Sequence, residues 1–233
     1  MRRRHITTSL LVLTTFAACV VEPNQRGGAG GAQPSGPDAA AQVDADTTDT
    51  VAARPPTRTD TLLLEGMAEP VELTLVRAPD GFPLPFTTYT TRDFVVESST
   101  SKGEGDPAVR FIAAFGGVRN DDAFLEVAAY PAGTTEAEAA ARAERAAGAG
   151  GTVVASDQTS PDWAVRQWRI AERDPRGGWI LGFAGLGRHA GRWFHILARY
   201  PGEYADGFGP RAELILEHWR WADGAPLAPP RSP

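Results

Sequence analysis

The sequence predicts an α+β domain in which helices lie against a twisted antiparallel sheet. Two observations support this class. Short runs of alternating apolar and polar residues, typical of half-buried strands, recur between residues 71 and 200 and are separated by tight turns. Helical spacing is confined to two stretches, near residues 135–147 and after residue 210. The order strands, helix, strands, helix with hairpin connections favours one antiparallel sheet with flanking helices.

The first group of strands is expected before residue 131. Residues 71–76 alternate as a half-buried strand should, and residues 94–97 form a second strand. Residues 109–115 and 123–130 flank two glycines and the polar run Arg119–Asp122. This arrangement predicts a hairpin.

The first helix is marked by a capping box at Thr135 and Glu138, a hydroxyl followed three residues later by a carboxylate. An alanine-rich run continues to Ala147, and Gly148 ends it. Because its buried side is mostly alanine, this helix is expected to lie close to the sheet.

The second half of the chain repeats the order of strands and helix. The expected strands are 152–154, 163–170, 179–186 and 192–200. The last two flank a hairpin loop at 187–191. Pro210 is expected to open the closing helix, since proline is tolerated in the first turn. The helix carries one apolar stripe: Ala212, Ile215, Leu216 and Trp219.

This second half resembles the Mog1/PsbP-like family. The resemblance rests on the hairpin from Trp179 to Tyr200, the exit Tyr200-Pro201 and the closing segment 214–221, with 88–94 as a matching earlier segment. Thr91 stands where that family often has proline. The resemblance implies a Mog1/PsbP-like sandwich over about 61–222 and an adaptor-like fold rather than a catalyst. It also implies a protein-binding or assembly role.

Cys19 is the single cysteine of the chain and follows a cationic start, an apolar stretch and two small residues. This order is that of a secretory signal. The segment from Phe16 to Cys19 resembles the lipobox of bacterial lipoproteins, with Phe16 in place of the usual leucine. A plain secretory peptide is an alternative, although it leaves an odd thiol in an oxidising compartment. A membrane-spanning anchor is another, although the apolar run is about half of the ~20 residues a bilayer requires.

Composition divides the chain into four segments. Residues 1–18 are the predicted signal peptide, and residues 19–60 are the lipidated cysteine with a disordered tether. The tether is rich in Gly, Pro, Ala, Thr and Asp and has no aromatic residue, so it has little apolar surface to bury. Residues 61–224 contain every Trp and Tyr and form the globular domain. Residues 225–233 form a disordered tail.

The net charge of −6 becomes −9 once the three arginines of residues 1–18 are removed. An acidic body argues against nucleic acid as a partner and against peripheral binding to anionic lipid. The acyl chains on Cys19, of the palmitate type, are therefore the expected membrane anchor. Val20 follows the cysteine, and an aspartate there would suggest retention in the inner membrane. The expected location is the bacterial cell envelope, with the outer membrane favoured where the cell has one.

No catalytic motif stands out. The chain has no Gly-x-Ser-x-Gly elbow, and Lys102 lies in a polar loop. His189, His195 and His218 could serve a metal only with a nearby carboxylate, and their spacing does not require one. We therefore expect a non-catalytic binding or assembly domain without a cofactor or metal. The alternative is an unrecognised metal-dependent or hydrolytic envelope enzyme that uses these histidines.

A binding surface is predicted on the strand 163–170. Its Arg166, Trp168 and Ile170 face combines apolar and cationic side chains, which suits an interface. Arg166 and Trp168 are expected to line a groove together with Trp221, which would bind a protein or a small ligand. The alternative is that Trp168 belongs to the core and Arg166 reaches solvent at its edge.

Overall fold

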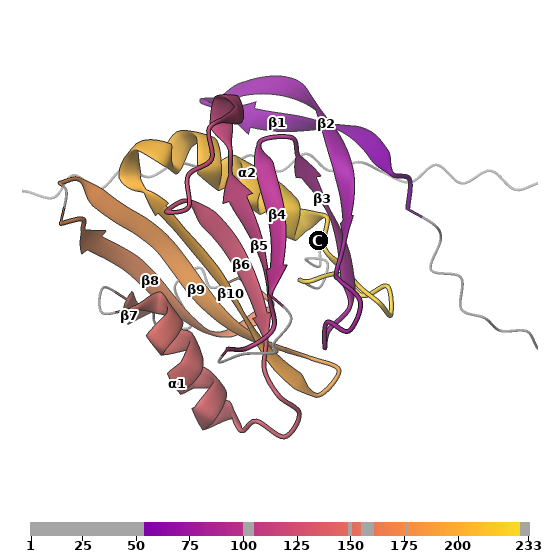
Figure 1. Cartoon of the computed structure of the whole chain (residues 1–233), viewed down its shortest axis with the longest axis vertical. Helices are drawn as coiled ribbons and strands as arrows, with labels where there is room; N and C mark the ends of the chain where they lie inside the picture. Colours follow the sequence, from indigo (N-terminus) through magenta and orange to yellow (C-terminus); the bar gives the residue numbers. More distant parts are fainter. Residues whose placement is uncertain (1–53, 100–104, 149–150, 155–160, 176, 229–233) are drawn as a thin grey trace, which may run out of the picture. The chain divides into compact units, whose positions relative to one another are not determined.

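The structure is a computed structural model and describes residues 54–99, 105–148, 151–154, 161–175 and 177–228 (Figure 1). The predicted signal peptide, Cys19 and residues 20–53 of the predicted tether lie outside this part of the chain. All described residues belong to the unit Thr48–Pro233. They form two antiparallel sheets and two α-helices, an arrangement compatible with the predicted α+β sandwich.

The smaller sheet joins the start of the described chain to its end. Its strands are β1 (Thr57–Leu64), β2 (Met67–Arg77), β3 (Phe86–Thr91) and β11 (Arg220–Trp221). They lie in the order β1-β2-β3-β11, and each neighbouring pair is antiparallel. The β1–β2 hairpin turns at Glu65 and Gly66, whose φ angles are 49° and 79°. Positive φ at both positions is typical of the type I′ turn, which matches the twist of the flanking strands.

The larger sheet carries both hairpins that the sequence predicts. Its strands are β4 (Phe94–Ser99), β5 (Ala108–Ala113), β6 (Phe124–Ala129), β7 (Gly151–Val154), β8 (Ala164–Arg173), β9 (Trp179–His189) and β10 (Arg192–Pro201). Their order is β4-β5-β6-β10-β9-β8-β7, again with antiparallel neighbours. The β9–β10 turn is tighter than predicted, because the strands run up to Ala190 and Gly191.

Helix α1 (Glu136–Ala147) begins at the predicted capping box. Thr135 Oγ1 accepts a hydrogen bond from the backbone N–H of Glu138 at 3.3 Å, and the Glu138 carboxylate accepts one from the N–H of Thr135 at 2.9 Å. Its buried residues are all alanine, and it lies across β8, β9 and β10 (Figure 1). The short side chains allow this close approach.

Helix α2 (Ala205–Glu217) corrects the prediction that Pro210 opens it, since Pro210 lies inside the helix. The first turn was missed because Gly207 and Gly209 lower its helix propensity. Burial of Phe208, which is 0% exposed, holds this turn against the core. The helix ends at Glu217, before Trp219 of the predicted apolar stripe, and Trp221 belongs to β11.

The core has three parts. The largest lies between the two sheets, where α2 contacts β1, β3 and β10, and its fully buried members include Phe111, Phe208, Ile215 and Trp219. A second core lies beneath α1 on the opposite face of the larger sheet, and Trp168 is at its centre. A small third cluster joins α2 to β1, β2 and β3 through Leu62, Leu73, Tyr89 and Leu214.

Two segments predicted to lie outside the domain contribute to it. The segment 54–60 includes the first half of β1, and Arg54 donates hydrogen bonds to Thr87 Oγ1 at 2.8 Å and to the carbonyl of His218 at 2.9 Å. At the other end, Leu227 is 7% exposed, and the N–H of Trp221 donates to the carbonyl of Ala225 at 2.9 Å. From the sequence, the domain was expected to begin at residue 61 and to end at residue 224, because the polar and proline-rich segments beyond these limits show no apolar periodicity.

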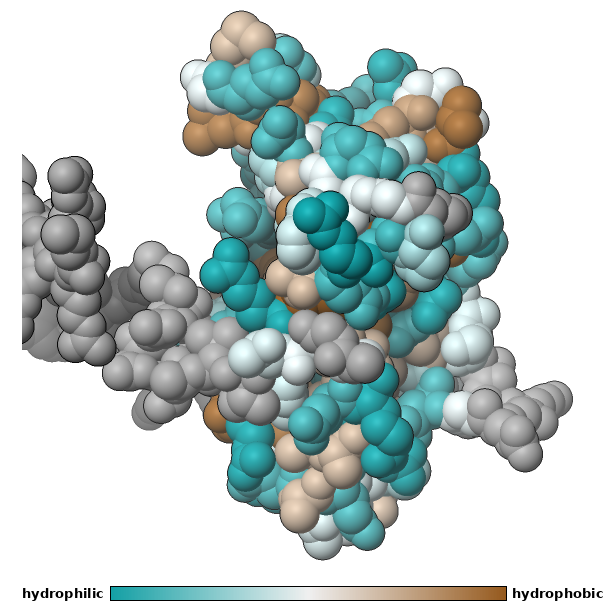
Figure 2. Space-filling model, turned by 90° about the vertical axis from the view of Figure 1, so that its left-hand side faces the viewer, coloured by the Kyte–Doolittle hydropathy of each residue, from teal (hydrophilic) through white to brown (hydrophobic). Residues whose placement is uncertain are grey.

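Seen from the side on which α1 lies, the surface is mostly hydrophilic, with smaller apolar areas (Figure 2). The end of the β1–β2 hairpin exposes two apolar side chains, Leu63 and Met67. Trp179, at the start of β9, is 46% exposed beside the guanidinium of Arg173. None of the helices within the described ranges has the length and apolar character needed to cross a membrane.

Candidate functional site

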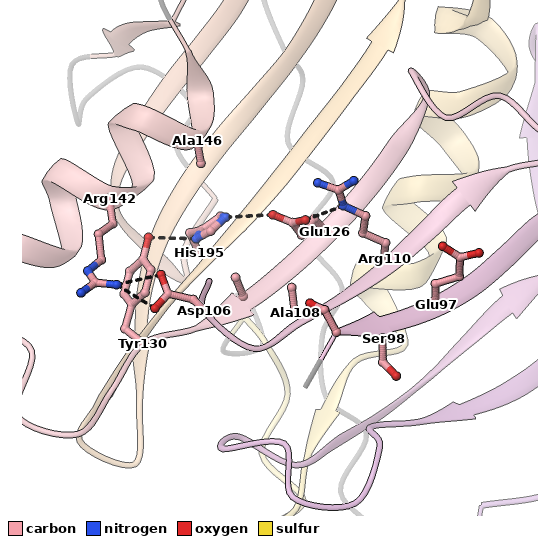
Figure 3. Close-up of a pocket in the computed structure, with 12 residues that line it drawn as sticks. Glu97, Ser98, Asp106, Ala108, Arg110, Glu126, Tyr130, Arg142, Ala146 and His195 are labelled. Atoms are coloured by element: carbon pink, nitrogen blue, oxygen red, sulfur yellow. Dashed lines mark hydrogen bonds and ion pairs between the residues drawn. The ribbon is translucent and has the colours of Figure 1, made fainter. Parts of the chain in front are cut away.

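A cavity of about 490 Å³ opens on the larger sheet beside α1. It is found there because α1 contacts mainly β8, β9 and β10 and so leaves the β4–β6 half of this face open. Strands β4, β5, β6 and β10 form the floor, and α1 forms one wall (Figure 3). The lining residues are Glu97, Ser98, Ser99, Asp106, Ala108, Arg110, Glu126, Ala128, Tyr130, Arg142, Ala146 and His195.

Strand register explains why the floor is hollow. Ser99 on β4 is opposite Ala108 on β5, Ala108 is opposite Ala128 on β6, and Ala128 is opposite His195 on β10. Residues directly opposite each other place their side chains on the same face of the sheet. Two alanines therefore occupy the middle of this row, and their methyl groups leave the space above them unfilled.

The next row of facing residues along the same strands supplies charged side chains at the edge of the cavity, which we call its rim. Glu97, Arg110, Glu126 and Leu197 are opposite one another in turn. The Nε of Arg110 donates to Glu126 Oε2 at 2.5 Å, and its guanidinium lies 4.4 Å from the centre of the Phe124 ring. An aromatic surface and a carboxylate thus hold Arg110 in place.

A chain of polar contacts extends from this pair into the protein. The hydroxyl of Tyr130 is 2.8 Å from Nδ1 of His195, and Nε2 of His195 is 3.4 Å from Oε1 of Glu126 (Figure 3). Tyr130 is 0% exposed and His195 is 5% exposed. The second contact is longer than a short hydrogen bond, and Nε2 is shielded from solvent. The arrangement fits an imidazole that accepts from Tyr130 at Nδ1 and directs Nε2 towards Glu126.

Burial and charge act in opposite directions on these groups. Burial alone would raise the pKa of Glu126, but its contacts with His195 and Arg110 outweigh burial and hold that pKa below its ordinary value. Glu126 is therefore a carboxylate at neutral pH. Burial, supported by the negative charge of Asp106, raises the pKa of Tyr130. Its hydroxyl therefore keeps its proton and remains a hydrogen-bond donor.

A second ion pair fixes α1 to the rim of the cavity. Nη1 of Arg142, on α1, donates to both carboxylate oxygens of Asp106 at 2.7 and 3.0 Å. The Arg142 guanidinium also lies 5.7 Å from the centre of the Tyr130 ring. Arg110 and Arg142 each use only part of their five N–H groups in these contacts. The other N–H groups have no hydrogen-bond partner among the described residues, so they could donate to a molecule in the cavity.

The structure does not bring the three predicted binding residues together. Trp168 is 2% exposed in the core beneath α1, whereas Trp221 is 3% exposed in the core between the sheets. The side chain of Arg166 is half-exposed, and its Nη2 lies 3.2 Å from Oε1 of Glu136 at the start of α1. The predicted groove is therefore corrected: α1 covers Trp168, and Arg166 reaches solvent at the edge of that helix. Cys19, the predicted lipidation site, lies outside the described residues.

The three histidines also lie apart. Each is paired with a different carboxylate: His189 with Asp223 at 3.2 Å, His195 with Glu126 at 3.4 Å and His218 with Asp60 at 2.9 Å. Within the part of the chain that the structure describes, no three His, Cys, Asp or Glu side chains are grouped as metal ligands. His189 is instead stacked on the ring of Trp221, with 4.5 Å between the ring centres.

Sequence reasoning missed Arg110, Glu126 and Tyr130. The available signal was a charged residue inside each apolar strand of the predicted hairpin, Arg110 in one and Glu126 in the other. In the structure these two residues are directly opposite each other, although a turn centred on the polar run 119–122 would have placed Arg110 opposite a later residue than Glu126. His195 similarly interrupts an apolar strand, but its neighbours on β6 could not be inferred, because β6 and β10 are distant in the sequence.

Comparisons with known proteins give little further information. No protein-family model matches the chain, and no curated protein matches its sequence. Among solved structures, a similar one is that of LpqN, described as involved in cell envelope biogenesis of Mycobacterium tuberculosis. It shares 13% sequence identity and a TM-score of 0.35, over 64% of this chain and 91% of LpqN. A likeness this loose does not establish a shared family or function.

Proposed function

We propose that this chain is a lipid-anchored protein of the bacterial cell envelope whose folded unit binds a small, neutral, polyhydroxylated molecule of the monosaccharide type. The observation that carries the binding proposal is the cavity beside α1, with its alanine floor and charged rim. The resemblance to the Mog1/PsbP-like family supports a binding or assembly role and forms part of the same proposal.

The mixed charge of the rim favours a neutral ligand. Glu97, Asp106 and Glu126 supply acceptors, while Arg110 and Arg142 supply N–H donors. A ligand with a single charge would be attracted by one set and repelled by the other. A hydroxyl group can donate to a carboxylate and accept from a guanidinium at the same time. Several hydroxyls on a rigid ring therefore suit this cavity best.

The contacts of His195 favour binding over catalysis. A general base requires a ring nitrogen within reach of the substrate. In His195 one nitrogen contacts the hydroxyl of Tyr130, and the other is directed at Glu126 and shielded from solvent. With one nitrogen bonded to Tyr130 and the other shielded from solvent 3.4 Å from Glu126, His195 is suited to holding Glu126 in place on the rim.

The envelope location is supported by the sequence alone. The cationic start, the apolar stretch and the small residues before Cys19 have the order of a lipoprotein signal. Acyl chains on Cys19 would hold the folded unit at a membrane, with the outer membrane favoured where the cell has one. This part of the proposal is tested separately from the cavity.

Isothermal titration of the full chain with glucose, galactose and N-acetylglucosamine tests the binding proposal. We expect saturable binding of at least one of them. Ala128→Leu should abolish it, because the longer side chain rises from the floor into the space above Ala108. Glu126→Gln should weaken it by about tenfold, as expected for loss of a charged hydrogen-bond acceptor.

Ala171→Leu is the matched control, since Ala171 is an exposed residue of β8 outside the cavity and the change adds the same atoms. Binding should be unchanged in this variant. Failure of all three sugars to bind, or binding that survives Ala128→Leu, would contradict the proposal.

A further inference from the structure

A second polar site lies on the smaller sheet, around Arg54. Its guanidinium donates from Nη1 to Thr87 Oγ1 at 2.8 Å and from Nη2 to the carbonyl of His218 at 2.9 Å. The same group lies 4.5 Å from the centre of the Tyr89 ring. These contacts hold Arg54 in one position and use two of its five N–H groups.

Two more arginines flank Thr87 on the same face. Arg77 of β2 and Arg220 of β11 are both directly opposite Thr87 of β3, one on each side. Side chains that are opposite in neighbouring strands lie on one face of a sheet. Arg220 is anchored by a hydrogen bond from Nη1 to the carbonyl of Trp219 at 2.6 Å, whereas Arg77 is exposed.

A surface hollow of about 440 Å³ adjoins this group. Arg54 and Pro56 line one side, and Thr74, Leu75 and Arg77 of β2 line the other. Two arginines, Arg54 and Arg77, therefore border one open space. This combination can donate several hydrogen bonds to a single oxyanion.

The three arginines give this site a positive charge. Among the described residues, no carboxylate lies within ion-pair distance of Arg54, Arg77 or Arg220. Burial lowers the pKa of Arg54 and outweighs Tyr89, which raises it, and the positive charges of Arg220 and Arg58 also lower it. In a chain with a net charge of −6, such a local group of cations would be stabilised by a bound anion.

We propose that Arg54 and Arg77, with Arg220 beside them, form a binding site for a phosphate group. The planar guanidinium matches two oxygens of a phosphate at once, which a lysine ammonium cannot do. The phosphate could belong to free inorganic phosphate or to the glycerophosphate headgroup of a lipid, since both have at least two unesterified oxygens. The site is on the smaller sheet and is independent of the cavity beside α1.

Titration of the full chain at constant ionic strength tests this site, with inorganic phosphate in one series and glycerophosphoglycerol, the deacylated lipid headgroup, in another. We expect saturable binding of at least one probe and a loss of affinity of about tenfold in Arg77→Gln. Arg77 is the residue to change because it is exposed, whereas Arg54→Gln also removes contacts to the end of α2.

Arg145→Gln, at an exposed arginine of α1, is the control for the same change in net charge. Binding of inorganic phosphate identifies the free ion as the source, and binding of glycerophosphoglycerol alone identifies a headgroup. Absence of binding by both probes overturns the proposal. Equal losses in Arg77→Gln and Arg145→Gln also overturn it, because they would show attraction by overall charge and not by a site.

Discussion

Replacing Tyr130 with phenylalanine removes a single oxygen atom from the polar chain beneath the cavity. The ring stays, so packing against α1 is kept, but Nδ1 of His195 loses its partner at 2.8 Å. His195 is 5% exposed, and water cannot readily replace the hydroxyl there. Leaving a buried polar atom unpaired costs about 1–3 kcal/mol. For a domain of this size, a cost of about 2 kcal/mol corresponds to a fall in Tm of roughly 4–8 °C.

Thermal and urea unfolding of the full chain measure this cost, and Tyr200→Phe is the matched control. Tyr200 is half-buried, and its hydroxyl has no hydrogen bond to any of the described residues. Its loss should therefore change the free energy of unfolding by no more than about 0.5 kcal/mol. In a chain that already carries His195→Phe, the Tyr130→Phe change should cost much less, because the partner has gone. Equal losses of unfolding free energy for the two tyrosine variants would refute the stabilising contact between Tyr130 and His195. Additive losses for the Tyr130 and His195 variants would refute it as well.

Three further predictions concern other parts of the molecule. Burial, opposed in part by Asp60, lowers the pKa of His218 in the folded protein, so the unfolded chain takes up a proton first and the free energy of unfolding falls as pH drops below 6.5. His218→Gln should reduce this pH dependence, measured by urea unfolding at a series of pH values. An unchanged dependence on pH would count against it. A Cβ at Gly185 would lie 2.3 Å from the Trp163 ring, so Gly185→Ala should lower the free energy of unfolding by about 1–3 kcal/mol. Gly209→Ala is the control: Gly209 lies in α2, a Cβ there would have nothing within 4 Å, and the change should be neutral or stabilising. A larger loss of stability in Gly209→Ala than in Gly185→Ala would refute this packing. Cys19→Ala should leave the chain unprocessed or release it from membranes, and unchanged fractionation would exclude the lipid anchor.

Local signals in the sequence predicted the local parts of the fold. The capping box at Thr135 sets the start of α1, because its two hydrogen bonds need only residues three apart. Both predicted hairpins form, since each has turn residues between two apolar strands. Strand β1 was missed, because its stability comes from pairing with β2 and from the contacts of Arg54, and not from its own polar composition.

The candidate site could not be predicted in the same way, because it depends on contacts between distant segments. Register within the β5–β6 hairpin brings Arg110 to Glu126, but the predicted turn at 119–122 is not centred between these two residues, so the sequence did not give their pairing. His195 joins the pair only because β10 lies beside β6. The predicted groove at Trp168 failed for a related reason: the sequence could not show that α1 covers that strand.

The position of α1 explains why the cavity lies over β4, β5 and β6 and not beside Trp168, where a groove was predicted. The alanine side of α1 fits closely over β8, β9 and β10, so Trp168 is enclosed there. The same offset leaves the β4–β6 half of the face without a helix, and there Ala108 and Ala128 keep the floor low. The Asp106–Arg142 ion pair then holds the edge of α1 at the rim. A shift of α1 towards β6 would close this space, so the residues that place the helix also determine whether the protein has a cavity.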